Sequence, residues 1–66
     1  MEKLTHREKT VLKLVTQGYG YAQISKLIFV STHTVKAHIS SIIRKLEAKN
    51  RANAIYIAIM HHMLDE

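Results

Sequence analysis

The sequence predicts an all-α fold of four helices in a single domain spanning residues 1–66. The clearest signal is in residues 31–46, where apolar side chains recur with the spacing of one helix face. Capping residues precede this segment and two others, and glycines separate the first two helical segments. Hydrophobic residues make up 47% of the chain, which is enough to fold a domain of this size.

The first helix is predicted to begin after Thr5. Thr5 and Glu8 have the spacing of a capping box, in which each side chain accepts a hydrogen bond from the other residue's backbone amide. Gly18 can adopt the left-handed conformation that ends many helices. The residues expected to face inward are Val11, Leu12, Leu14 and Val15.

The second and third helices are predicted on either side of a short turn. Gly20 opens the second helix, Val30 enters the core from the turn, and Ser31 caps the third helix, which runs to about Glu47. The buried stripe of the second helix is Ile24 and Ile28. The inward face of the third helix is formed by Val35, Ile39, Ile42 and Leu46.

The opposite face of the third helix carries small or cationic side chains that can approach base edges and phosphates. They are Thr32, His33, Lys36, Ala37, Ser40 and Arg44. Residues 9–46 contain six Lys or Arg and no Asp or Glu, and the chain has a net charge of +5. A solvated lysine-rich surface is the commoner reason for such a charge, so the charge favours a polyanionic partner only together with the helix pattern.

The fourth helix is predicted from Arg51 to about Met63, with Asn50 as its cap. It has more apolar residues than one packed face requires, and a second apolar stripe usually marks a partner surface. The core side is assigned to Ala54, Ile55, Ala58 and Ile59. The outward stripe is assigned to Tyr56, Ile57, Met60 and Leu64.

The order and spacing of these residues resemble the LuxR-type helix-turn-helix domain over about Leu4 to Leu64. Such domains occur in NarL/FixJ response regulators, in quorum-sensing regulators and in stand-alone GerE-like regulators. The matching positions are Leu4, Thr5, Arg7, Glu8, Val11, Leu12, Gly18, Ile24, Ile28, Val30, Ser31, Thr34, Val35, Lys36, His38, Ile42, Lys45, Leu46, Asn50, Arg51 and Ala54. The resemblance implies that the second and third helices form the helix-turn-helix and that the fourth makes dimer contacts.

The resemblance places the third helix in the DNA major groove. It implies base contacts by His33, Lys36, Ala37 and Ser40. Phosphate contacts are expected from Tyr21, Lys26, Thr32, Thr34, Arg44 and Lys45. The chain departs from the family at Gly20, where Ser is usual, and at Tyr21, where Asn is more frequent. Many relatives have a larger residue at position 40, so a water-mediated contact is an alternative to direct readout by Ser40.

Structural roles are the alternatives for several of these residues. Thr34 can help to cap the third helix, and the ring of Tyr21 can pack against the first helix. His38 is expected to be partly buried, and Arg51 to have a structural role. The last carbonyls of the third helix, or the carboxylate of Glu47, can also pair with the positive charges of Arg44, Lys45 and Arg51.

Catalytic and metal sites are not expected. The chain has no Cys, no Gly-rich phosphate loop and no carboxylate pair in the predicted core. His33 and His38 are five residues apart and His61 and His62 are adjacent, so neither pair has the spacing that shares a metal on one helix face. No cofactor and no enzymatic activity are predicted. A cytoplasmic location is expected because no secretory signal and no membrane-length apolar stretch occur in this sequence.

The function predicted from the sequence is sequence-specific binding of double-stranded DNA, as a homodimer through the fourth helix, for transcriptional regulation. RNA polymerase is a further partner that such a regulator can contact. The chain is either the effector domain of a response regulator or quorum-type regulator, or a stand-alone GerE-like protein. The alternatives are a protein-interaction or dimerisation module on the same scaffold, and non-specific or RNA binding by a basic helical domain.

Overall fold

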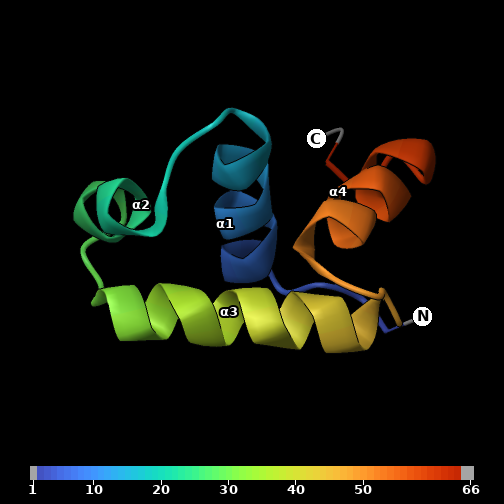
Figure 1. The fold of residues 1–66 in the computed structure, drawn as a ribbon, viewed down its shortest axis with the longest axis horizontal. Helices are drawn as coiled ribbons and strands as arrows, with labels where there is room; N and C mark the ends of the chain where they lie inside the picture. The colour runs from blue at the N-terminus through green and yellow to red at the C-terminus, as the bar shows by residue number, and fades with distance from the viewer. Residues whose placement is uncertain (1, 65–66) are drawn as a thin grey trace.

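The computed structural model describes residues 2–64 and contains α1 (His6–Thr16), α2 (Tyr21–Leu27), α3 (Thr32–Lys45) and α4 (Arg51–Met60). The longest helix, α3, runs along one side of the molecule, and α1 stands across its middle (Figure 1). The short α2 lies beside the beginning of α3, and α4 lies toward its end. The predicted all-α, four-helix fold is confirmed. No helix in the described residues is long and apolar enough to span a bilayer.

The predicted helix caps are present. The side chain of Thr5 accepts from the Glu8 amide at 3.1 Å, and Glu8 accepts from the Thr5 amide at 2.9 Å, which completes the capping box of α1. Ser31 Oγ accepts from the Thr34 amide at 3.0 Å at the start of α3. Asn50 Oδ1 accepts from the Asn53 amide at 2.8 Å at the start of α4. These bonds satisfy amides that have no partner within their own helix.

Each of the four helices is followed by a residue with positive φ, two positions after its last helical residue. These residues are Gly18 (94°), Phe29 (59°), Glu47 (53°) and His62 (53°). In each case the residue that follows the positive-φ residue donates its backbone amide to the carbonyl of the residue five positions before it, as in a Schellman motif. α3 therefore ends at Lys45 rather than near Glu47, and α4 ends at Met60 rather than near Met63.

The core is assembled from all four helices. Its buried apolar residues are Leu4, Val11, Leu12, Ile24, Val35, Ile39, Ile42, Leu46, Ala54 and Ala58. Leu14, Val15, Ile28 and Val30 are partly buried against this cluster. The predicted inward face of α3 is thus confirmed, and α3 is held by that face while its opposite side is left open.

The orientation of α4 differs from the prediction. Ile59 was assigned to the core but is 55% exposed, whereas Ile57 and Leu64 are partly buried against the core. Successive residues of a helix are rotated by about 100°. Because α4 buries Ala54 and Ala58, Ile59 lies well outside the inward arc and Ile57 lies at its edge. The large exposed apolar residues of α4 are Tyr56, Ile59 and Met60.

Candidate nucleic-acid interface

The outer face of α3 is a continuous exposed surface with no acidic side chain. Its exposed residues are Thr32, His33, Lys36, Ala37, Ser40 and Arg44. Val35, Ile39 and Ile42 on the opposite face are buried and fix the rotation of the helix about its axis. The structure therefore brings the four predicted base-contacting residues together on one side of one rigid helix.

Two residues with alternative structural roles are half-buried. The hydroxyl of Thr34 lies 3.0 Å from Ser31 Oγ, beside the cap of α3. This contact supports the capping role for Thr34, and its phosphate contact stays a prediction. His38 is half-buried, as expected for a residue between the two faces of α3.

Tyr21, at the start of α2, is half-buried and packs against the core. Two cations lie over its ring: Arg51 Cζ is 5.5 Å from the ring centroid, and Lys36 Nζ is 6.0 Å from it. These distances reach the range of cation–π attraction, which extends to about 6 Å. The ring of Tyr21 thus brings together the starts of α2 and α4 and the outer face of α3.

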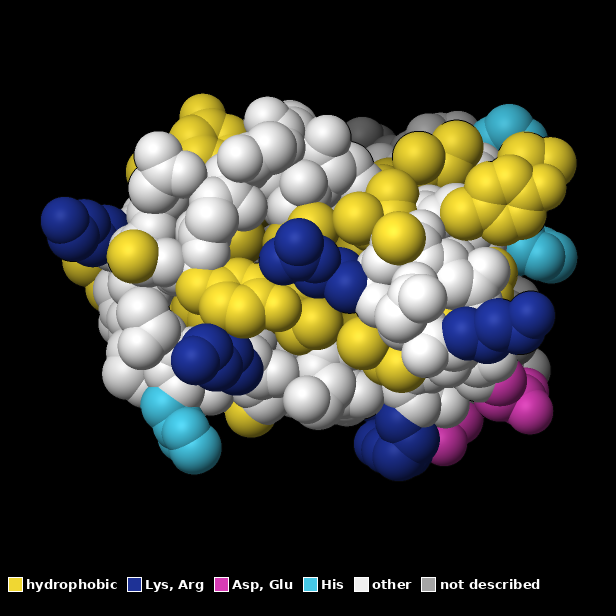
Figure 2. Space-filling model, viewed as in Figure 1, with side chains coloured by type: hydrophobic (Ala, Val, Ile, Leu, Met, Phe, Trp, Pro, Cys, Tyr) yellow, Lys and Arg dark blue, Asp and Glu magenta, His cyan; other side chains and the backbone are white. Residues whose placement is uncertain are grey.

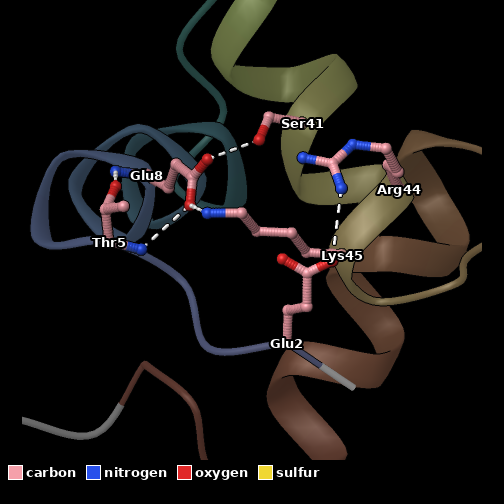
Figure 3. Close-up of polar contacts among 6 residues, drawn as sticks. All are labelled: Glu2, Thr5, Glu8, Ser41, Arg44 and Lys45. Atoms are coloured by element: carbon pink, nitrogen blue, oxygen red, sulfur yellow. Dashed lines mark hydrogen bonds and ion pairs between the residues drawn. The ribbon is translucent and has the colours of Figure 1, made fainter.

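The cations at the end of α3 have carboxylate partners (Figure 3). Lys45 Nζ lies 2.8 Å from Glu8 Oε1, in an ion pair whose side chains are only 13% and 5% exposed. Ser41 Oγ donates to the other carboxylate oxygen of Glu8 at 2.6 Å. Arg44 pairs with Glu2 at 3.2 Å, but both side chains are 64% exposed. The buried pair fixes α1 against α3, whereas the exposed pair is readily exchanged for another anion.

The surroundings of Glu8 lower its pKa. Burial alone would raise the pKa, but hydrogen bonds from Lys45, Ser41 and the Thr5 amide, together with the charge of Lys45, lower it from 4.5 to about 2. Glu8 is therefore ionised at neutral pH and compensates Lys45. The phosphate contact predicted for Lys45 requires its ammonium to leave this buried carboxylate.

The charge on the visible face is unevenly distributed (Figure 2). Lys and Arg side chains are spread across this face around a central band of hydrophobic side chains, and acidic side chains appear only at its lower right edge. Lys26, in the last turn of α2, is exposed. Such a distribution suits an extended polyanion better than a single small anion.

Two features of this region were not predicted from the sequence. The capping box identified Glu8, but its bonds to Ser41 and Lys45 join residues 33 and 37 positions apart in the chain. Helical periodicity gives no information on such long-range contacts. The contact between Arg51 and the Tyr21 ring was missed for the same reason.

The helix-turn-helix class of DNA-binding domains is defined by a short helix, a tight turn and a longer helix with one buried and one exposed face. In this chain these elements are α2, the turn after it and α3. Within that class, the chain belongs to the luxR family of bacterial regulatory proteins, whose model matches residues 2–58. It is a LuxR-type helix-turn-helix DNA-binding domain of the kind found in transcription regulators. The resemblance seen in the sequence is confirmed.

Individual proteins agree with the family. The response regulator protein VraR of Staphylococcus aureus is 36% identical over 63 residues, which cover 96% of this chain and 30% of VraR. The solved structure of the transcription factor GerE superposes with a TM-score of 0.90 at 32% identity, covering 96% of this chain and 94% of GerE. The response regulator ChrA gives a TM-score of 0.87 at 33% identity, covering 96% of this chain and 31% of ChrA. The chain thus spans less than a third of VraR and of ChrA.

Proposed function

We propose that this domain binds double-stranded DNA sequence-specifically, with α3 in the major groove, and that it does so as a dimer to regulate transcription. The observation that carries the proposal is the outer face of α3, which is exposed, has no Asp or Glu among the residues of α3 and is fixed by a buried inner face. A major groove accepts one α-helix, and it distinguishes all four base pairs by their edges. The small and cationic side chains of this face suit such recognition.

Each of the four residues predicted to contact bases has a proposed role consistent with its chemistry. Lys36 donates to guanine O6 and N7, and the methyl group of Ala37 contacts thymine. His33 lies in the first turn of α3, near the groove entrance, and Ser40 bonds to a base directly or through water. Lys36 is expected to contribute most to specificity because its contact is the strongest of the four.

Phosphate contacts are proposed for exposed or half-buried residues around this face. They are Tyr21, Lys26, Thr32, Thr34 and Arg44. Arg44 can exchange its exposed partner Glu2 for a phosphate because a surface ion pair contributes only about 0–1 kcal/mol. Lys45 is proposed to be structural, since leaving Glu8 would strand a buried charge.

Selection of bound sequences from a random duplex library tests this function. A two-fold symmetric motif with a guanine at a fixed position supports the proposal. Lys36→Ala is the matched variant, because it removes one exposed ammonium from the face and should relax the preference at that guanine. Equal affinity for selected and random duplexes over a salt series would instead indicate non-specific binding.

The dimer contact is proposed to be the exposed apolar stripe of α4. Tyr56 and Met60 of the predicted interface are exposed, and Ile59 lies beside them. Ile57 and Leu64 pack partly against the core and are available only at the edge of the stripe. Such a short stripe buries little surface area. The dimer should therefore form mainly on DNA, where two adjacent half-sites hold two copies of the domain side by side.

Cooperativity on paired half-sites separates this interface from DNA recognition. Ile59→Asp or Met60→Asp should leave binding to a single half-site nearly unchanged and should abolish cooperative binding to two half-sites about one helical turn apart. Single-site affinity and circular dichroism are the controls for folding. Cooperativity that survives both substitutions in a folded protein would exclude α4 as the interface.

The regulator that carries this domain is proposed to be a response regulator, because VraR and ChrA are named as response regulators. A stand-alone regulator is the alternative, since GerE is matched over 94% of its length. A cytoplasmic location and contact with RNA polymerase follow from the proposed role in transcription. Reading the coding sequence around this segment distinguishes the two architectures.

A further inference from the structure

The ring of Tyr21 has a cation from each of two other helices over it. Arg51 Cζ, at the start of α4, lies 5.5 Å from the ring centroid, and Lys36 Nζ of α3 lies 6.0 Å from it. Tyr21 itself is the first residue of α2. One side chain therefore connects the proposed recognition helix with the start of the proposed dimer helix.

The ring is anchored, whereas the two cations are open to solvent. Tyr21 is half-buried and packs against the apolar core, but Lys36 and Arg51 are exposed. Long cationic side chains can lie along an apolar surface while their charged ends stay in water. A ring fixed by the core thus limits the directions of both side chains without covering their charges.

Lys36 and Arg51 differ from the cations at the end of α3 in their pairing with the described carboxylates. The cations at the end of α3 are paired, Arg44 with Glu2 and Lys45 with Glu8. Within residues 2–64, neither Lys36 nor Arg51 forms an ion pair with a carboxylate. Both cations can therefore pair with an anion without first leaving a carboxylate of the described residues.

We infer that Arg51 is a DNA phosphate ligand and that Tyr21 is a positioning residue whose ring holds Arg51 beside Lys36. This inference rests on the proposed binding of DNA by α3. With Lys36 in the major groove, Arg51 near the same ring faces the phosphates that border the groove. Arg51 then does more than begin α4, and the ring of Tyr21 has this positioning role in addition to the phosphate contact proposed for the residue.

The ring contact is tested in the free domain by NMR, without DNA. The side-chain protons of Arg51 should show ring-current shifts that Tyr21→Leu removes and Tyr21→Phe retains. Shifts typical of a fully solvated arginine in the parent protein would overturn the inference. This measurement is independent of the proposed function.

The role in DNA binding is tested by a salt series with a selected duplex. Arg51→Ala should reduce the slope of log affinity against log salt by about 0.9, the value for one phosphate contact. Lys49→Ala is the matched control, because it removes an exposed cation two residues earlier in the chain and should keep the parent slope. An unchanged slope for Arg51→Ala, or an equal loss in Lys49→Ala, contradicts a specific phosphate contact.

Combining substitutions tests the coupling through the ring. Tyr21→Leu should weaken binding about two- to fivefold and reduce the further effect of Arg51→Ala, whereas Tyr21→Phe should preserve that effect. An equal effect of Arg51→Ala in the Leu and Phe backgrounds would overturn the positioning role. A parent domain that binds no duplex overturns the proposed function and this inference together, and intact ring-current shifts would then show that the ring contact itself is present.

Discussion

Replacement of Glu8 by Gln is predicted to remove most of the stability of this domain. The glutamine side chain keeps an oxygen that can accept from the Thr5 amide, but it leaves the ammonium of Lys45 without a counter-charge at a site where the Lys45 side chain is only 13% exposed. Removing one partner of a buried pair costs about 3–5 kcal/mol. A domain of this size has a total stability of about the same magnitude.

The pKa of Glu8 gives a second value for this contribution. Each unit by which the folded pKa lies below the unfolded pKa corresponds to about 1.4 kcal/mol of stability. With a folded pKa of about 2 against an ordinary value of 4.5, ionised Glu8 contributes about 3 kcal/mol at neutral pH. Because the folded pKa is the lower one, this stability is fully present above pH 4.5 and is lost as the pH falls toward 2.

Urea unfolding followed by circular dichroism over a pH series measures both effects. Glu8→Gln should lower the free energy of unfolding at neutral pH by about 3 kcal/mol and flatten its decline between pH 4.5 and about 2. Glu2→Gln is the matched control, because its exposed pair with Arg44 should contribute less than about 1 kcal/mol.

Adding Lys45→Met to Glu8→Gln should recover stability, since no buried charge is then left unpaired. This second variant also keeps the test informative if Glu8→Gln alone does not fold. Equal losses in Glu8→Gln and Glu2→Gln, or an unchanged acid decline in Glu8→Gln, would refute the reasoning.

Three further substitutions separate folding from recognition. Val35→Ala should lower the free energy of urea unfolding by about 2 kcal/mol because it opens a cavity in the core; full stability would mean that the face of α3 is misread. Lys36→Ala should weaken binding to a selected duplex by about 1–3 kcal/mol in a fluorescence titration while hardly changing stability, and unchanged affinity would exclude its base contact. Asn50→Ala should cost about 1 kcal/mol in thermal unfolding through loss of the α4 cap, and unchanged stability would exclude a contribution from its bond to the Asn53 amide.

Local signals in the sequence were sufficient for the helices and for the face of α3. The caps at Thr5, Ser31 and Asn50 act over three residues, and the inward stripe of α3 follows from helical periodicity alone. The ends of α3 and α4 were predicted two or three residues too late. Glu47 and His62 adopt left-handed conformations there, and neither residue type signals such a turn as glycine does.

Contacts between helices were not predictable in the same way. The orientation of α4 depends on which of its sides meets the core. Because α4 has apolar residues on nearly all of its sides, the sequence prediction placed Ile59 in the core and Ile57 outside it, the reverse of the structure. The pairing of Lys45 with Glu8 depends on how α1 crosses α3. Both are properties of tertiary packing, for which a single sequence offers no periodic signal.

The turn between α2 and α3 has a consequence for the geometry of recognition. Phe29 occupies a left-handed conformation, which is unfavourable for a bulky residue, and its side chain is 92% exposed and so gains little from packing. The side chain at position 29 therefore does not favour this turn. Ile24 of α2 and Val35 of α3 are buried in the same apolar core, and we expect this packing to hold the angle between the two helices. Substitutions in this part of the core should alter the direction in which α3 is presented to a duplex, even where the domain stays folded.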